Sequence, residues 1–294
     1  MALNRTGVLL MAHGTPSTMD EMPEYLRLVR GGRPPSPELV AEMRHNYEAI
    51  GGRSPLTDLT LRQAEALRER LGPDVAVAVG MRNWTPFIAE AIEELRGRGI
   101  VRLIGIPLAP QVSTLSIGKY YTAASAALGD GMELVRVPSY YRHPLLVRAF
   151  AERVQAMRPG PGDEIVFTAH SLPQRVVEEG DGYADEVAAT ARGVAAAAGI
   201  ETFQIAYQSA GRTPEPWIGP ALDDVVARRA AEGIRRFFVV PIGFVCDHTE
   251  VLFDIDIQAR EAARAAGASL RRTESLNTSP AFIGVLEALV REAL

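Results

Sequence analysis

Two histidines of this chain stand directly after short runs of apolar residues. His170 follows the run 165–169, and His13 follows the run 7–12. Such runs are typical of strands buried on both faces of a parallel sheet, and ligands of such sheets bind beyond the carboxyl ends of the strands. A neutral imidazole accepts a proton near pH 7 and also ligates metal ions. If the two halves of the chain face each other, both histidines approach one cleft from opposite sides.

A third cluster of polar side chains, CDHTE, occupies residues 246–250 and opens a helical pattern after the apolar run 235–244. Asp247 fits the N-cap of that helix, with Glu250 three positions later as in a variant of the capping box. A place in a functional site fits Asp247 equally well. The pattern alone leaves both interpretations open.

Glu250, Asp254 and Gln258 recur at intervals of four residues and therefore share one face of the predicted helix. Oxygen ligands suit a hydrated divalent cation, so this row fits a path that leads a cation from solvent toward a histidine. The path ends in a neutral amide at Gln258. A solvated helix face is the alternative, because the apolar residues of the segment lie mostly on its other faces.

Short apolar runs alternate along the chain with longer amphipathic stretches. The runs cover residues 7–12, 75–81, 101–108, 132–138, 164–169, 202–208 and 235–244. The amphipathic stretches include residues 61–71, 88–96, 146–157, 183–198 and 221–231. This strand–helix–strand rhythm predicts an α/β protein in which helices flank parallel sheets.

The two halves of the sequence also repeat one another. The echoes, in chain order, are AHGTP (12–16) with AHSLP (169–173), Thr85-Pro86 with Thr213-Pro214, and residues 99–110 with 233–244. Three echoes in the same order indicate an internal duplication. We therefore predict two Rossmann-like domains, residues 1–140 and 141–294, each with a parallel sheet flanked by helices.

The composition excludes several classes of protein. The net charge is −5 and no block of Lys or Arg is present, so the chain lacks the electrostatic footprint of a nucleic-acid-binding protein. The apolar runs are too short for a bilayer span or a signal peptide, which favours the cytoplasm. Cys246 is the single cysteine, so a four-cysteine iron–sulfur cluster cannot form within one chain. Phosphate-loop and common hydrolase motifs are absent from the sequence.

Taken together, these residues resemble the ferrochelatases, a family that inserts ferrous iron into a porphyrin in haem biosynthesis. The resemblance extends over nearly the whole chain and is carried by MAHGTP, YEAIGGRSPL, LAPQVSTLSIGKYY, FTAHSLP, YQSAGRTPEPWIGP and PIGFVCDHTEVLFDID. It implies two Rossmann-like domains with a porphyrin cleft between them. By residue match, His170 is the active-site histidine, Glu250 its partner glutamate, and Asp254 an acid that routes metal or protons. The resemblance thus implies that these three residues bind the metal in transit.

Within the family the chain is most similar to bacterial enzymes that use coproporphyrin III, a porphyrin with four propionates. Arg30, Ser54 and Tyr120 match positions at which that group contacts the propionates. A guanidinium, a hydroxyl and a phenol are suitable partners for carboxylates. The resemblance therefore implies that these three residues bind the substrate.

Two positions depart from the pattern of that group. His13 replaces a tyrosine metal ligand, and imidazole is itself a good iron ligand. Asn46, beside Tyr47, replaces an arginine, which weakens the recognition of four carboxylates and keeps protoporphyrin IX open as a substrate. We expect His13, Asn46 and Tyr47 to contact the porphyrin, with His13 also a ligand of the metal.

The resemblance also implies the partners of the protein. Porphyrin and Fe²⁺ are expected as substrates, no tightly bound cofactor is expected, and a haem-processing enzyme is expected to receive the product. The protein is expected to be a cytoplasmic monomer with at most peripheral contact to a membrane. Two other functions remain open: a chelatase for another tetrapyrrole and metal, and a non-catalytic porphyrin or haem carrier. The pairing of His170 with Glu250 favours an enzyme, because a carrier needs a ligand but no base–acid pair.

Overall fold

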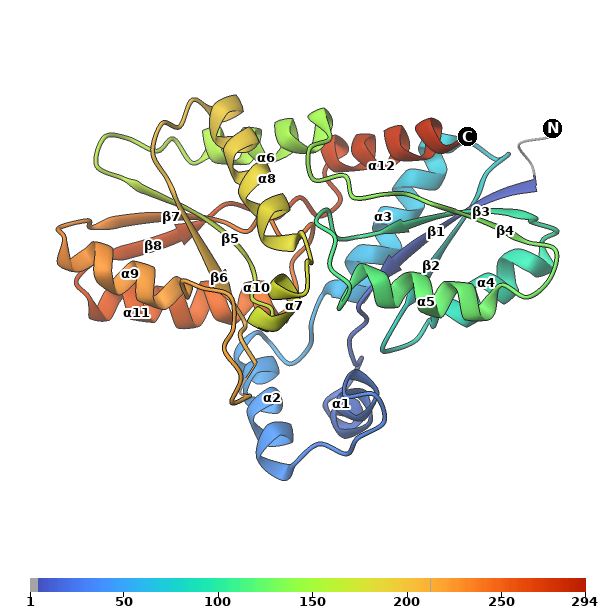
Figure 1. The fold of residues 1–294 in the computed structure, drawn as a ribbon, viewed down its shortest axis with the longest axis horizontal. Helices are drawn as coiled ribbons and strands as arrows, with labels where there is room; N and C mark the ends of the chain where they lie inside the picture. Colours follow the sequence, from blue (N-terminus) through green and yellow to red (C-terminus); the bar gives the residue numbers. More distant parts are fainter. Residues whose placement is uncertain (1–4, 212) are drawn as a thin grey trace.

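The computed structural model describes residues 5–211 and 213–294 and contains two four-stranded parallel sheets (Figure 1). The first has the strand order β2-β1-β3-β4 and the second β6-β5-β7-β8. The strands are β1 (Thr6–Ala12), β2 (Ala76–Met81), β3 (Arg102–Pro107), β4 (Glu133–Arg136), β5 (Glu164–His170), β6 (Gln204–Gln208), β7 (Arg236–Val240) and β8 (Ser269–Arg272). The α/β prediction is confirmed, and each of the seven predicted runs contains a strand.

Strand β8 was not predicted from the sequence. It forms the edge of the second sheet, and of its four residues only Leu270 is buried. A four-residue strand with a serine and two arginines carries no apolar run, so the periodicity of the sequence does not reveal it.

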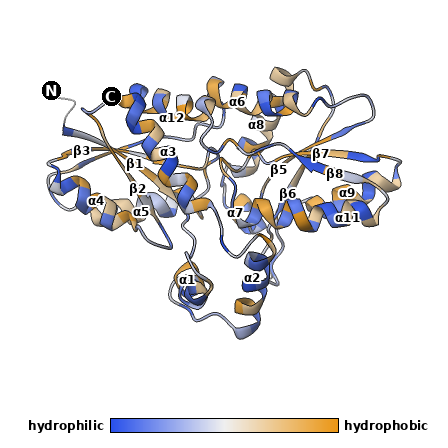
Figure 2. Ribbon diagram, turned by 180° about the vertical axis from the view of Figure 1, so that it is seen from behind, coloured by the Kyte–Doolittle hydropathy of each residue, from blue (hydrophilic) through white to orange (hydrophobic). Residues whose placement is uncertain are grey.

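Helices cover both faces of each sheet, and alternate strand residues point to opposite faces. Val8 and Leu10 of β1 belong to a central core, whereas Leu9 and Met11 pack toward α4 and α5 on the outer face. Figure 2 shows that the flanking helices carry both hydrophobic and hydrophilic residues, as expected for helices with one face on a sheet. The helices of the sheet layers are α3 (Leu56–Leu71), α4 (Ile88–Gly97), α5 (Ile117–Ala127), α6 (Pro144–Ala156), α7 (Gln174–Glu178), α8 (Tyr183–Ala198), α9 (Leu222–Ala231), α10 (Thr249–Leu252), α11 (Arg260–Ala265) and α12 (Pro280–Ala293).

The duplication is visible in the identical strand order of the two sheets. It is also visible beside β2 and β6, the second strand of each half in chain order. Beside β2 the Met81 amide donates to the Pro86 carbonyl, and beside β6 the Tyr207 amide donates to the Pro220 carbonyl. Both prolines follow cis peptide bonds. The structural counterpart of Thr85-Pro86 is therefore Gly219-Pro220. The predicted echo with Thr213-Pro214 is wrong. Thr213-Pro214 and Gly219-Pro220 lie close together in the sequence, and Thr213-Pro214 is the one identical to Thr85-Pro86.

The last helix connects the two halves of the molecule. Helix α12 packs against α3 and α6, and the Arg102 guanidinium of β3 donates to the Ala293 carbonyl at a distance of 2.8 Å. The central core contains residues of both sheets, including Ile104 and Phe167. The predicted boundary near residue 140 stays a prediction, and side-chain packing continues across it.

A small lobe projects from the two sheet layers and consists of α1 (Met22–Val29) and α2 (Pro37–Ala49) (Figure 1). Its own cluster of buried residues includes Tyr25 and Tyr47, with Trp84 packed against them. The lobe therefore holds aromatic side chains beside the carboxyl ends of the first sheet. No helix within residues 5–211 and 213–294 is both long and apolar enough to cross a membrane.

Candidate active site

A cavity of about 880 Å³ is lined by residues of both sheet layers and of α2. Eight of the nine residues that were expected to bind substrate or metal line it: His13, Asn46, Tyr47, Ser54, Tyr120, His170, Glu250 and Asp254. Arg30 is exposed at the C-terminal end of α1 and lies outside the lining. The fold thus gathers all but one of the predicted residues around a single space.

His170 is the last residue of β5, and the backbone beyond it is closely packed. The Ser171 amide donates to the Gln208 carbonyl at the end of β6 at 2.7 Å. Gly243, after β7, lies against the same strand end, where a Cβ atom would come within 2.7 Å of the Ala169 Cβ. Only glycine permits this approach, which brings the segment carrying Glu250 up to His170.

His170 and Glu250 form an ion pair in the cavity, with 3.4 Å between Nε2 and Oε1. Their side chains are 31% and 40% exposed, so both groups are open to the cavity. The Nδ1 atom of His170 lies against the Ser171 carbonyl. Burial alone would lower the pKa of His170, but the charge and hydrogen bond of Glu250 outweigh it and raise this pKa to about 9. Burial alone would raise the pKa of Glu250. His170 and His248 outweigh this effect, so the pKa of Glu250 lies well below its usual value.

His248 is a member of the site that the sequence reasoning missed. Its Nε2 atom lies 3.2 Å from Oε2 of Glu250, and its Nδ1 atom lies 3.0 Å from the Cys246 carbonyl. Each carboxylate oxygen of Glu250 therefore faces one imidazole. The backbone of His248 is extended, with φ −161° and ψ −178°, so its ring turns toward the residue two positions later. The DHTE motif at residues 247–250 was the sequence signal for His248, but this motif was interpreted as the start of a helix.

The N-cap interpretation of Asp247 is wrong, because His248 occupies the N-cap position of α10. The Asp247 carboxylate accepts hydrogen bonds from the Ser275 hydroxyl at 2.7 Å and from the Asn277 amide at 2.9 Å. It also lies 3.0 Å from the Arg272 guanidinium. Asp247 is thus directed into the protein, away from the helix amides.

Asp254 begins η3 (Asp254–Ala259), a π-helix that continues α10 and precedes α11. Burial raises the pKa of Asp254 to about 6, although a hydrogen bond from the Ser209 hydroxyl opposes this shift. Gln258, farther along the same helix, donates to the Asp223 carboxylate of α9 at 2.7 Å. Asp223 also lines the cavity, so the amide predicted to end the row of oxygen ligands lies against a carboxylate from another element.

His13 follows β1 and faces the cavity from the first sheet. Burial and the nearby Arg82, His248 and His170 lower its pKa to about 4, despite an opposing effect of Glu250. The ring is therefore neutral at pH 7. The Asn83 side-chain amide lies 3.1 Å from its Nε2 atom.

The remaining predicted residues form the walls of the cavity. The buried Tyr47 hydroxyl lies 2.6 Å from the Thr15 hydroxyl. Burial raises the pKa of Tyr120, so this phenol stays protonated. Ser54 is buried before α3, whereas Asn46 of α2 is partly exposed. Among the residues that the structure describes, no group of three or more His, Cys, Asp or Glu side chains has an arrangement that would hold a metal ion.

Solved structures that superimpose on this chain include a sirohydrochlorin chelatase. The sirohydrochlorin chelatase of Bacillus subtilis subspecies spizizenii in complex with cobalt superimposes with a TM-score of 0.57 at 11% identity, covering 98% of this chain and 95% of that chain. A Bacillus subtilis structure of the same protein with Fe³⁺ gives a TM-score of 0.62 at 12% identity, with the same coverage. At these identities the likeness establishes the fold, which is the duplicated chelatase architecture predicted above.

The amino-acid sequence places the chain within one family of this fold. The family model described as Ferrochelatase matches residues 5–294. A ferrochelatase of Deinococcus radiodurans is 43% identical over 97% of this chain and 94% of the relative. A coproporphyrin III ferrochelatase of Geobacillus kaustophilus is 37% identical over 99% of this chain and 96% of the relative. The chain belongs to the ferrochelatase family, and it is an enzyme that inserts iron into a porphyrin in haem synthesis.

Proposed function

We propose that this enzyme inserts Fe²⁺ into coproporphyrin III and that the reaction takes place between His13 and the His170–Glu250–His248 cluster. The observation that carries this proposal is the contrast between the two sides of the cavity. His13 presents a neutral imidazole, whereas on the opposite side Glu250 raises the pKa of His170 and also lies 3.2 Å from Nε2 of His248. One side is suited to bind a metal, and the other is suited to hold and release protons.

The chemistry of insertion requires both properties. A free-base porphyrin carries two pyrrole N–H protons, and both must leave when the ring binds Fe²⁺. In the free enzyme His170 is largely protonated at pH 7, because its pKa is about 9. An Fe²⁺ ion close to His170 disfavours the imidazolium and displaces its proton, which frees the Nε2 lone pair. Glu250 and His248 then offer a path by which protons leave the ring.

Substrate binding is assigned to the walls of the cavity. Tyr47 and Asn46 belong to the lobe helix α2, while Ser54 and Tyr120 supply hydroxyl groups that suit propionates. A cleft that holds the macrocycle in a distorted shape favours the transition state over the flat substrate. Coproporphyrin III is preferred in this proposal because the Geobacillus relatives carry that substrate in their names. Protoporphyrin IX is the competing substrate, since Asn46 is neutral.

Anaerobic absorption spectroscopy tests the choice of substrate. The purified protein is mixed with Fe²⁺ and either coproporphyrin III or protoporphyrin IX, and the loss of the free-base bands is followed. We expect faster loss with coproporphyrin III. Faster loss with protoporphyrin IX would reverse the assignment, and tight binding of both without conversion would favour a carrier.

We also infer the setting in which the enzyme works. The proposal is a cytoplasmic monomer that needs no resident cofactor and passes its product to a haem-processing enzyme. The family likeness supports it, together with the single cysteine, which is too few for an iron–sulfur cluster. Sedimentation of the purified protein, with and without porphyrin, measures its molecular mass. A mass of two or more chains would contradict the proposed monomer.

A further inference from the structure

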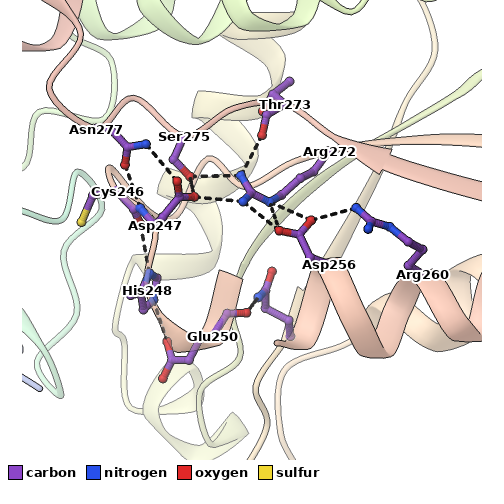
Figure 3. Close-up of polar contacts among 11 residues, drawn as sticks. Cys246, Asp247, His248, Glu250, Asp256, Arg260, Arg272, Thr273, Ser275 and Asn277 are labelled. Carbon is purple, nitrogen blue, oxygen red and sulfur yellow. Dashed lines mark hydrogen bonds and ion pairs between the residues drawn. The ribbon is translucent and has the colours of Figure 1, made fainter. Parts of the chain in front are cut away.

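Arg272, the last residue of β8, lies behind the active site and contacts two carboxylates at once (Figure 3). Its Nη2 atom is 3.0 Å from Oδ1 of Asp247 and 2.8 Å from Oδ2 of Asp256. Its Nε atom donates to Asp256 at 3.0 Å, and its Nη1 atom donates to the Thr273 carbonyl at 3.0 Å. The side chain is only 11% exposed, so these bonds are shielded from water.

The Asp247 carboxylate is held by several partners inside the protein. Besides Arg272, its carboxylate accepts from the Ser275 hydroxyl and the Asn277 amide, and its backbone amide donates to Oδ1 of Asn277 at 2.9 Å. Figure 3 shows these partners arranged around one carboxylate. Two side-chain donors and the neighbouring Arg272 guanidinium fix the direction of this carboxylate.

Asp256 lies on the far side of Glu250 in the chain. It belongs to the π-helix η3, in which Asp254 lines the cavity and Asp256 instead contacts Arg272. Arg272 thus joins the residue three positions before Glu250 to the residue six positions after it. The segment that carries His248, Glu250 and Asp254 is held at both ends by one planar guanidinium.

The same cluster reaches the first half of the molecule. The Asn277 carbonyl accepts a hydrogen bond from the side-chain amide of Gln63 at 2.9 Å, and Gln63 is fully buried in α3. Cys246, one residue before Asp247, packs against Leu56 and Leu59 of the same helix. The position of the Glu250 segment relative to the first sheet therefore depends on this cluster.

We propose that Arg272 is a positioning residue for iron insertion, which sets the place of the Glu250 carboxylate between the two imidazoles by bridging Asp247 and Asp256. The proposal rests on the proposed function of the Glu250 cluster. A guanidinium suits this task, because it offers five donors in one rigid plane, whereas an ammonium offers three donors on a flexible stem. Displacement of a reacting group by about 1 Å costs on the order of a hundredfold in rate.

The primary test compares Arg272→Lys with a matched control, Arg260→Lys. Arg260 contacts the same Asp256 at 3.2 Å, but it is 54% exposed and has no contact with Asp247. We expect Arg272→Lys to lower kcat about ten- to hundredfold while KM for porphyrin changes less than about twofold. Arg260→Lys should leave both constants unchanged. Equal effects of the two substitutions, or a change confined to KM, would overturn the proposal.

A second test asks whether Arg272 acts through Glu250. In a Glu250→Gln background, Arg272→Lys should cause almost no further loss of kcat, because residues that act as a unit are not additive. If the loss of kcat in the double variant equalled the product of the two single losses, Arg272 would act independently of Glu250, and the proposal would be contradicted. If Arg272→Lys does not fold, Asp247→Asn takes its place, since its amide nitrogen must face a donor, either Arg272 or Asn277.

A third readout does not depend on turnover. Ring ¹H–¹⁵N spectra at one fixed pH report the surroundings of His170 and His248 directly. Arg272→Lys should move both sets of ring signals, and Arg260→Lys should move neither. If the wild-type protein inserted no iron, the proposed function would fail, while these spectra would still decide whether Arg272 positions Glu250. Unmoved signals in Arg272→Lys would contradict the positioning role.

Discussion

Glu250 lies between two imidazoles, with Oε1 3.4 Å from Nε2 of His170 and Oε2 3.2 Å from Nε2 of His248. His170 reaches this point from the end of β5, whereas His248 belongs to the segment that follows β7. The carboxylate thus joins two strand ends of the second sheet. It also raises the pKa of His170.

The Glu250→Gln substitution removes the carboxylate that offers a path for protons beside His170. We expect iron insertion to slow by about 10²- to 10⁴-fold, the usual contribution of a group in acid–base catalysis. Single-turnover absorption measurements with Fe²⁺ and bound porphyrin give this rate. A rate within about twofold of wild type would remove Glu250 from the reaction.

The pH dependence of the same variant has a definite sign. Against the effect of burial, Glu250 together with the Ser171 carbonyl and Asp254 raises the pKa of His170 from 6.5 to about 9. In the wild type the neutral imidazole therefore accumulates, and the rate climbs, as pH rises toward 9. Without the carboxylate charge, burial lowers this pKa, and the rising limb should move to lower pH. A histidine titration by NMR measures the pKa directly, and an unchanged or higher value in Glu250→Gln would contradict the assignment.

His13→Ala tests the side of the cavity that faces the first sheet. With a pKa of about 4, the wild-type imidazole is neutral at pH 7 and free to bind iron. The substitution should change the absorption spectrum of the bound haem product more than it changes turnover. An identical product spectrum would exclude His13 as a ligand.

Gly243→Ala tests the close packing that brings the Glu250 segment to β5. A Cβ atom at this position would meet Ala169 at 2.7 Å, and overpacking of this kind costs about 1–3 kcal/mol of unfolding free energy. We expect a lower Tm together with a loss of kcat. Gly233→Ala probes a glycine with nothing within 4 Å of its added Cβ, although its φ of 102° also disfavours alanine. A smaller loss of kcat at 233 than at 243 is expected, and the reverse order would contradict the packing argument.

Much of the fold follows from the sequence, because apolar runs and amphipathic stretches report the burial that determines parallel sheets. The site was predicted where a residue stands directly at a strand end, as His13 and His170 do. A site residue was missed where the backbone changes from extended to helical within a few residues. His248 lies in an extended step before α10, and two residues apart on an assumed helix do not share a face.

The pairings of Asp247 and Gln258 were beyond the sequence for a different reason. Their partners, Arg272 and Asp223, come from separate elements, β8 and α9, whose approach depends on tertiary packing. Arg30 shows the opposite case. It matches a substrate-binding position by sequence, yet in the structure it lies exposed outside the cavity lining, and its role stays a prediction.

The most direct test of the whole account is a single-turnover experiment with His170→Ala. The variant is saturated with coproporphyrin III, which should bind because the aromatic and hydroxyl walls of the cavity are unchanged. Fe²⁺ is then added without oxygen, and the free-base absorption bands are followed. The account predicts that porphyrin binds and that the bands persist. Loss of the bands at the wild-type rate would contradict the central role given to His170.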